Sequence, residues 1–321
     1  MAQPSRFQQA ALAAALTLTM GTAAAQAQQL SLVIAFPAGG PADSLARVVA
    51  AQLEKELDQR IIVENKPGGN GAVAASYVNR ARPDGQTLFL SSVGAISINP
   101  GLYPKLIYNP TKDFAPVAML ISTPEVLVVG ENHPAKTAQD FLAKLKDGKT
   151  TLASSGIGSM PHMAIAQLKV SSKQPVLHVP YKGAAPAITD TIGGQVDGFI
   201  GDISGLVGNL QAGKLRALAT AAPKRSPVVP DTPTFDELGV PNVYANNWYG
   251  VLAPSATPKD KIDALNAAFN RVLESKALKD YEASTGVELS PMSPEAFGKI
   301  IKEDTEKWGA LIKAENITVD E

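Results

Sequence analysis

Apolar residues in this chain are gathered in short runs, and most runs are followed by a Gly-, Ser- or Pro-rich turn and then by an amphipathic segment. The first run is Leu32–Phe36; Pro37–Pro41 ends it, and the apolar spacing from Asp43 to Leu57 predicts a helix. Short apolar strands that alternate with helices predict an α/β fold in which mainly parallel sheets are flanked by helices. The same order recurs along the chain, with further strands predicted at Ile61–Val63, Leu88–Leu90, Thr151–Ser154, His178–Tyr181, Gly198–Asp202 and Leu215–Thr220.

Two longer apolar stretches, Glu125–Val129 and Trp248–Pro254, are predicted to cross between two lobes. Lobe 1 is then discontinuous, with residues 28–125 plus 250–321, and lobe 2 has residues 126–249. The C-terminal part is predicted to be helical, because each segment begins near a proline or a capping residue. Its three predicted helices are Pro258–Glu274, Lys276–Ser284 and Pro294–Lys313.

The N-terminal residues have the three parts of a secretory signal peptide. Arg6 supplies the positive charge, the segment Ala10–Met20 is apolar, and Ala25-Gln26-Ala27 is an A-x-A cleavage signal. Spanning a bilayer takes roughly 20 apolar residues, and this run is about half that long. We therefore expect residues 1–27 to be removed and the mature protein to be exported to the periplasm.

Composition and charge narrow the chemistry. The formal net charge of −1 argues against a general nucleic-acid binder, which needs a basic surface to hold phosphates. The chain has no cysteine, so disulfides, thiolate catalysis and cysteine metal ligands are excluded. His133 and His178 lie far apart in the sequence and lack the spacing of metal ligands. We expect neither a metal nor a cofactor.

Five Gly- or Ser-rich turns lie at the predicted carboxyl ends of strands, which is the edge where α/β sheets bind ligands. Backbone N–H groups at helix N-termini favour anions, glycine permits close approach of the backbone, and serine adds a hydroxyl donor. A tight turn explains any one of these segments by itself, so their composition is only compatible with an anion site. The turns are Pro37–Asp43, Ser91–Ala95, Ser154–Ser159, Tyr181–Ala184 and Gly201–Ser204.

Blocks of sequence spread over nearly the whole mature chain carry a specific resemblance. They are Ile34–Asp43, Glu64–Gly69, Arg82–Gly85, Ile98–Tyr103, Asp113–Val117, Ser154–Ser159, His178–Gly183, Leu215–Ala219, Pro230–Thr234 and Trp248–Pro254. In this order they resemble the Bug family, the substrate-binding proteins of tripartite tricarboxylate transporters. The resemblance implies a monomeric, two-lobed periplasmic binding protein of type II, a Venus flytrap, with no catalytic activity. It also implies that the protein captures a small dicarboxylate, tricarboxylate or aromatic acid, such as a benzene dicarboxylate. The ligand is then taken up through the large and small membrane subunits of a tripartite transporter.

The same resemblance implies where the ligand is held. One carboxylate lies between a first ligand loop, Phe36–Asp43, and a second ligand loop, Ser154–Ser159, with His162 just beyond it. Asp202 faces the ligand or its waters, and more variable residues read the distal end, where Asn246 and Asn247 indicate uncharged hydrogen bonding. Trp248 is either packing at the hinge or a wall of the site. The implied ligand residues are Phe36, Ala38, Gly39, Gly40, Asp43, Ser91, Ser92, Ala95, Ser154, Ser155, Gly156, Ser159, His162, Tyr181, Lys182, Asp202, Asn246 and Trp248.

Three other functions fit parts of the sequence. Gly69–Ala74 matches G-x-G-x-x-A, but four residues separate it from the preceding strand, and the next strand ends in serines instead of an acidic residue. Ser159 and His162 share one helix face, as in a serine hydrolase, but no complete triad is present. We expect His162 to pack beneath the loop and orient it, and Asp43 to cap the first helix. A receptor that feeds carboxylate signalling fits as well as one that feeds transport.

Overall fold

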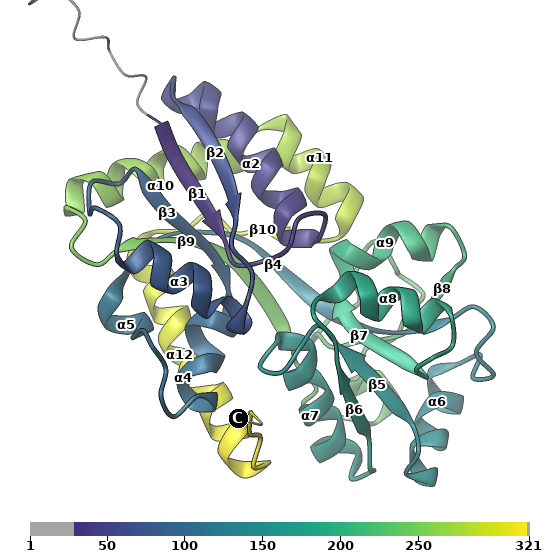
Figure 1. The fold of residues 1–321 in the computed structure, drawn as a ribbon. Coiled ribbons are helices and arrows are strands. Elements are labelled where there is room, and N and C mark those ends of the chain that lie inside the picture. The colour runs from purple at the N-terminus through teal and green to yellow at the C-terminus, as the bar shows by residue number, and fades with distance from the viewer. Residues whose placement is uncertain (1–28, 320–321) are drawn as a thin grey trace, which may run out of the picture.

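The computed structural model describes residues 29–319, which form two α/β lobes joined through shared strands (Figure 1). The predicted signal peptide, residues 1–27, lies outside the described residues. None of the helices within 29–319 is both long and apolar enough to cross a bilayer. The α/β class expected from alternating strands and helices is confirmed.

Lobe 1 contains the first three strands and most of the C-terminal part of the chain (Figure 1). Its strands are β1 (Gln29–Ile34), β2 (Arg60–Asn65), β3 (Thr87–Ser92), the first part of β4 (Phe114–Gly130), β9 (Asn246–Pro254) and β10 (Glu288–Leu289). Its helices are α2 (Pro41–Leu57), η1 (Gly69–Gly71), α3 (Ala72–Asn79), η2 (Gly94–Ile98, a π-helix), α4 (Asn99–Leu102), α5 (Pro110–Asp113), α10 (Lys259–Leu273), α11 (Lys276–Thr285) and α12 (Pro294–Ala314).

Lobe 2 is formed by the middle of the chain. Its strands are the second part of β4, β5 (Thr151–Ser154), β6 (Leu177–Pro180), β7 (Gly198–Asp202) and β8 (Leu215–Thr220). Its helices are α6 (Ala138–Lys144), η3 (Leu145–Asp147), α7 (Met160–Ser172), α8 (Ala184–Ile192), α9 (Ile203–Gln211) and η4 (Asp236–Leu238). Four of these elements, β5, α8, β7 and β8, have the predicted bounds.

The strand order β2-β1-β3-β9-β4-β7-β5-β6 runs through both lobes, and β4 belongs to both. The pairs β1·β2, β1·β3, β5·β6 and β5·β7 are parallel, as the strand–helix alternation predicts. β4 and β9, however, pair antiparallel with each other and with their other neighbours, so both sheets are mixed. The physical reason is that the chain enters lobe 2 along β4 and returns in the opposite direction.

The two crossings differ in detail from the predicted ones. β4 extends beyond Glu125–Val129, because its first part already pairs with β9 in lobe 1. β9 pairs only with lobe 1 strands, so the return crossing lies before Trp248–Pro254. At that crossing the N–H of Ala245 donates to Ala221 O at 2.9 Å, and its carbonyl accepts the N–H of Glu125 at 3.1 Å. The lobe boundaries given above stay a prediction.

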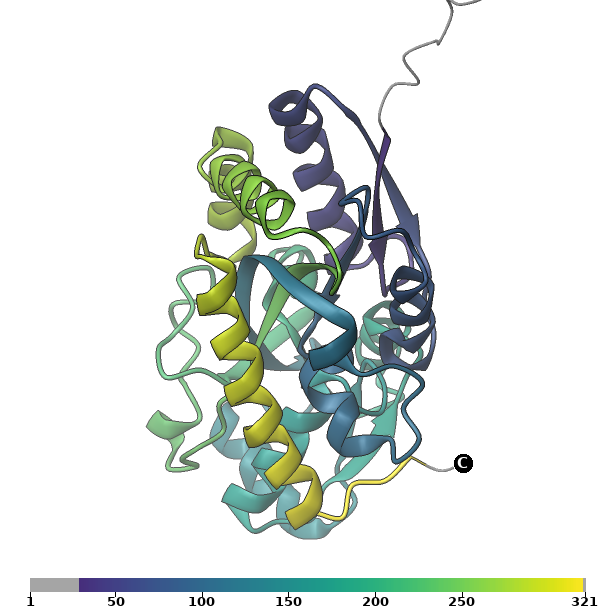
Figure 2. The same cartoon turned by 90° about the vertical axis from the view of Figure 1, so that its left-hand side faces the viewer.

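Three apolar clusters support this architecture. One lies between the lobe 1 sheet and helices α2 and α10, and includes Leu45 and Phe269. A second packs under α8 and α9 in lobe 2. The third continues from lobe 1 into lobe 2, from Trp308 on α12 to Met163 on α7. Helix α12 runs along the outside of lobe 1 toward lobe 2 (Figure 2), so the lobes share buried surface beside the two crossings.

Candidate functional site

The first ligand loop joins β1 to α2 and is organised by one carboxylate. Oδ2 of Asp43 accepts the backbone N–H of Gly39 at 3.0 Å and Nε of Arg47 at 2.9 Å. Oδ1 accepts Nη2 of Arg47 at 3.0 Å and Nδ2 of Asn65 at 2.9 Å. Asp43 is buried, and the guanidinium of Arg47 is the main cause that lowers the pKa of Asp43 to about 2. The charged carboxylate therefore holds the shape of the loop from behind.

This geometry shows that the expected role of Asp43 as a helix cap is wrong. The N-cap of α2 is Gly40, and Asp43 lies in the first turn, from which it reaches back to Gly39. Gly39 has a φ of +83°, a backbone conformation that favours glycine. Ala38 and Gly39 are exposed, so the turn presents backbone, not bulky side chains, at its tip.

The second ligand loop joins β5 to α7 and folds back on itself. Ser159 caps α7 by accepting the N–H of His162 at 3.4 Å, and its hydroxyl donates to Gly156 O at 2.6 Å. The N–H of Gly156 donates to the hydroxyl of Ser154 at 3.2 Å. Gly156 and Gly158 have φ of +138° and +76°, which an L side chain rarely adopts. The loop is therefore a set of tight turns that ends at a capped helix N-terminus.

Two histidines support the second ligand loop from below. Nε2 of His178, on β6, lies 2.6 Å from the hydroxyl of Ser154, and Nδ1 of His162 accepts the N–H of Gly158 at 3.2 Å. The two rings are stacked, with centroids 3.9 Å apart and an angle of 13° between their planes. Burial lowers the pKa of His162 to about 3 and that of His178 to about 4. Both rings are thus neutral at neutral pH, which lets His162 accept a hydrogen bond.

The loops of the two lobes meet one another. A Cβ on Gly183 would lie 3.9 Å from Cγ of Pro37, and the N–H of Gly183 donates to Ser155 O at 3.1 Å. A Cβ on Gly205 would lie 2.8 Å from Cγ of Pro41. These contacts lie at or just before the starts of α2, α8 and α9, so three helix N-termini lie close together between the lobes, with Ser155 of the loop that precedes α7 beside them. Helix N-termini carry partial positive charge and unpaired N–H groups, so this arrangement suits an anion.

Two buried carboxyl groups lie beside these loops at the hinge, which is the place where β4 crosses between the lobes. Asp202, at the end of β7, accepts the hydroxyl of Thr123 at 2.8 Å and caps α9 through Ser204. Glu125 is its directly opposed partner in the β4·β7 register, and burial raises the pKa of both carboxyls, that of Glu125 most strongly. Tyr249 is also buried, and its ring packs edge-on against Phe36, with centroids 5.8 Å apart. The first ligand loop thus contacts the hinge through Phe36.

Trp248 lies in the core, which favours packing over a wall of the site, while its role in ligand binding stays a prediction. The residue is 2% exposed, and its indole donates to Oδ2 of Asp304 at 2.8 Å. The ring also meets Phe297 at right angles, with centroids 5.0 Å apart. It is therefore a packing residue of lobe 1. Asn246 is exposed, whereas its neighbour Asn247 is buried and points to the opposite face of β9.

The remaining candidates of the distal end do not form one cluster of contacts. Ser91 and Ser92 are buried at the end of β3, and the methyl group of Ala95 lies 2.7 Å from where a Cβ of Gly71 would be. In lobe 2, Tyr181 donates to Oδ2 of Asp190 at 2.7 Å, which raises the pKa of Tyr181 to about 12. Lys182, beside it, is exposed. The roles of these residues in ligand binding stay predictions.

The arrangement of serine and histidine does not support hydrolysis. The cap contact of Ser159 is to the backbone of His162, not to its ring. Ser154 does contact the ring of His178, but within residues 29–319 neither His162 nor His178 is paired with a carboxylate that could orient it. Ser154 also exchanges hydrogen bonds with the backbone of Gly156. The contact therefore fits loop support better than nucleophile activation.

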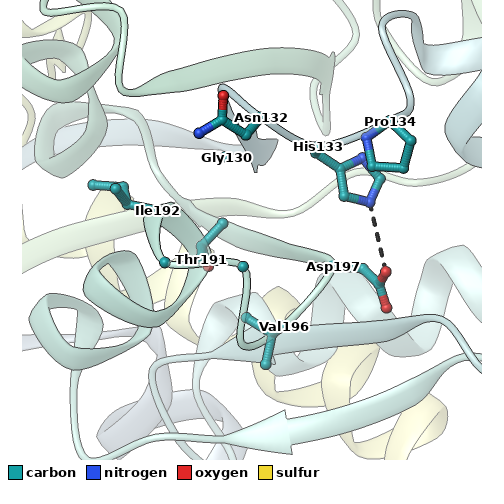
Figure 3. Close-up of a pocket in the computed structure, with 10 residues that line it drawn as sticks. Gly130, Asn132, His133, Pro134, Thr191, Ile192, Val196 and Asp197 are labelled. Atoms are coloured by element: carbon teal, nitrogen blue, oxygen red, sulfur yellow. Dashed lines mark ion pairs between the residues drawn. The ribbon is translucent and has the colours of Figure 1, made fainter.

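A separate cavity of about 330 Å³ lies in lobe 2, beside the C-terminal end of α8 (Figure 3). Nε2 of His133 faces Oδ1 of Asp197 across 3.5 Å, and Asp197 also pairs with Lys144 and accepts the N–H of Thr151. These bonds tie β5 and α6 to the loop before β7. The cavity is lined by none of the predicted ligand residues, so we do not assign the ligand to it.

Sequence reasoning missed four residues that shape the site: Asn70, Glu125, His178 and Tyr249. Asn70 lies in the segment weighed as a dinucleotide fingerprint, yet its amide bonds to Asn99 and to the carbonyl of Gly158. His178 lies in the block His178–Gly183 that resembles the Bug family, and this resemblance is the only feature of the sequence that indicates a role for it in the site. Glu125 begins an apolar run, and nothing in the neighbouring sequence indicates that its carboxyl group is buried.

The chain is similar to known binding proteins over most of its length. A sequence profile described as the tripartite tricarboxylate transporter family receptor matches residues 45–317. BugT from Bordetella pertussis is 30% identical over 89% of this chain and 89% of its own. MatC from Rhodopseudomonas palustris, solved with bound malate, is 33% identical, with a TM-score of 0.83 over 88% of this chain and 98% of MatC. Another R. palustris protein, solved with adipate, is 30% identical, with a TM-score of 0.86 over 90% and 98% of the two chains. The periplasmic-binding-protein fold expected from the sequence is confirmed.

Proposed function

The chain belongs to the tripartite tricarboxylate transporter receptor family, and from this we propose that it is a periplasmic receptor that binds a small organic carboxylate between its lobes. One observation carries the proposal: the N-termini of α2, α8 and α9 lie close together where the first ligand loop meets lobe 2. A carboxylate there would accept backbone N–H groups from both lobes, and each charge-assisted bond contributes about 1.5–3 kcal/mol.

Similar proteins support the choice of ligand class. MatC was solved with malate and a second relative with adipate, which are both dicarboxylates. A dicarboxylate would place one carboxylate at the helix N-termini and direct its other end toward the distal candidates. The buried acids Asp202 and Glu125 lie at the hinge beside this cleft. Among the predicted ligand residues only Lys182 is a cation, so a dianion fits better than a citrate-like trianion.

Binding would close the lobes over the ligand. Contacts that the ligand makes on both ligand loops are complete only when the lobes are together, and such contacts shift the population toward the closed form. The receptor would then deliver its ligand to the large and small membrane subunits of a tripartite transporter. It would act as a monomer in the periplasm, after removal of residues 1–27, without catalysing a reaction.

A ligand screen tests this function. Thermal unfolding of the chain without residues 1–27 is measured with malate, adipate, citrate and a benzene dicarboxylate, each beside its neutral amide. A ligand at a hundred times its dissociation constant adds about 2.7 kcal/mol of stability, which corresponds to a rise in Tm of about 5–10 °C. The matching amide should give no rise. If no acid raises Tm, or if amides do so equally, carboxylate binding is refuted. X-ray scattering should show compaction with the binding acid only.

A further inference from the structure

Gly158, in the second ligand loop of lobe 2, is seated against three residues of lobe 1, which we call the Gly158 socket: Asn70, Asn99 and Leu102. A Cβ on Gly158 would lie 2.6 Å from Cδ2 of Leu102 and 2.9 Å from Nδ2 of Asn70. Oδ1 of Asn99 lies 3.5 Å from the same point. Gly158 is buried in this arrangement. Only a residue without a side chain fits so closely against the opposite lobe.

Both polar backbone groups of Gly158 have partners, one from each lobe. Its N–H donates to Nδ1 of His162 at 3.2 Å, within lobe 2. Its carbonyl accepts Nδ2 of Asn70 at 2.7 Å, from lobe 1. The first bond does not depend on the position of the lobes, whereas the second exists only when the lobes are together. The neutral His162, stacked on His178, therefore holds the loop in the shape that fits the socket.

Asn70 is held in place by lobe 1 before it meets lobe 2. Its backbone is left-handed, with a φ of 47°, in the short helix η1, and asparagine tolerates this conformation well. Nδ2 of Asn70 also donates to Oδ1 of Asn99 at 2.8 Å, and Nδ2 of Asn99 returns a bond to Asn70 O at 3.1 Å. Asn99 is fully buried and is held by Tyr108, whose hydroxyl donates to Ala95 O. Asn70 thus loses little further side-chain entropy when it binds Gly158.

We propose that Asn70 is the positioning residue through which lobe 1 holds the second ligand loop in the closed form. It contacts the loop instead of the ligand. Because the bond is made only in the closed form, it shifts the equilibrium between open and closed lobes and slows ligand release more than it affects ligand capture. The effect on ligand release rests on the proposed function, whereas the effect on closure does not.

A second contact between the lobes serves as a control. Nζ of Lys169 on α7 lies 3.2 Å from Oε2 of Glu315, just after α12. The side chain of Lys169 is 51% exposed, and surface ion pairs of this kind contribute little. Lys169→Ala should therefore leave closure unchanged within about twofold. Comparing Lys169→Ala with Asn70→Ala shows whether every contact between the lobes affects closure or only the buried contact between Asn70 and Gly158.

The experiment measures lobe separation directly. The chain has no cysteine, so Val73→Cys on lobe 1 and Val170→Cys on lobe 2, both exposed, give two unique labelling sites for single-molecule energy transfer. Asn70→Ala should lower the ratio of closed to open molecules by about 2- to 10-fold, as expected for one hydrogen bond. Asn70→Asp, which places an anionic oxygen against the Gly158 carbonyl, should lower it by more than about tenfold. With a bound acid, ligand dissociation should speed up by the same factors.

Two further variants separate the Asn70–Gly158 contact from general damage. Tyr108→Phe removes a hydrogen bond from the same network without touching lobe 2, so it should lower Tm but reduce the closed fraction much less than Asn70→Ala does. Gly158→Ala should prevent seating, because its methyl group would lie 2.6 Å from Leu102 and 2.9 Å from Asn70, at a φ of +76° that disfavours any L side chain. A closed fraction unaltered by Asn70→Asp, or reduced equally by Tyr108→Phe, would overturn the proposal. If no acid binds the unmodified protein, the proposed function fails, while the distances without ligand still test the role of Asn70 in closure.

Discussion

Replacing Asp43 with asparagine tests whether charge, and not only shape, organises the first ligand loop. The carboxylate of Asp43 accepts four hydrogen bonds, from Gly39, Asn65 and twice from Arg47. An asparagine side chain has the same size, but its amide nitrogen would face donors where Asp43 offers an oxygen. Asp43→Asn should therefore destabilise the folded protein, and the loss should depend on pH.

The magnitude follows from the pKa of Asp43. Lowering the pKa of an aspartate from an ordinary value near 3.8 to about 2 corresponds to about 2.5 kcal/mol. The side chain of Arg47, the main partner, is 56% exposed, and solvent screening reduces the charge-dependent part to about 1–2 kcal/mol. Because the pKa is lower in the folded state, this stability is complete above about pH 4 and is lost as pH falls through 2.

The assay is urea unfolding followed by tryptophan fluorescence, at several pH values between 7 and 2, for the original chain and for Asp43→Asn. The difference in free energy of unfolding should shrink by about 1–2 kcal/mol toward pH 2, since all other titrations are common to both proteins. Arg47→Ala should cost less than Asp43→Asn at pH 7. A difference that is constant with pH, or that grows on acidification, would refute the reasoning.

Two further predictions concern residues behind the site. Between pH 6.5 and pH 4, His162 and His178 bind protons in the unfolded chain but not in the folded protein, so Tm should fall as the pH falls through this window. His178→Gln should make this fall in Tm smaller. If Tm depends on pH equally in the variant and the original chain, the reasoning is contradicted. Trp248→Phe removes the buried bond to Asp304 and should cost about 1–3 kcal/mol in chemical unfolding, with carboxylate affinity unchanged within about threefold by calorimetry. A large loss of affinity at unaltered stability would instead make Trp248 a wall of the site.

Local sequence predicted the secondary structure best where an element is bounded by turns. β5, β7, β8 and α8 have the predicted bounds, because glycine or serine limits the apolar run of each. The first part of β4 was not predicted. Pro116, Ser122 and Pro124 interrupt its apolar pattern, and its pairing with β9 joins residues more than a hundred positions apart. Such a strand is stabilised by its partner and not by its own propensity.

In the candidate site, too, the features set by local sequence were predicted and those set by distant contacts were not. The two ligand loops were predicted, because a glycine-rich turn between a strand and a helix is a local feature and its place at a sheet edge follows from the fold class. Glu125, Asn70 and His178 were not assigned to the site, since each acts through a contact far away in the sequence. Trp248 could not be assigned for the same reason: its burial depends on Phe297 and Asp304 of α12.

By itself, the sequence determined the α/β class, the order of strands and helices, the glycine-rich turns of the two predicted ligand loops, and the family. These follow from local hydrophobic periodicity, turn residues and ordered motifs, which act over a few residues at a time. Only the tertiary structure decided that Asp43 supports its loop instead of capping a helix, that two neutral histidines stack beneath the second loop, and that Asn70 reaches Gly158 across the lobes. Those outcomes depend on burial and on distances of a few ångströms between distant segments, and no local pattern encodes them.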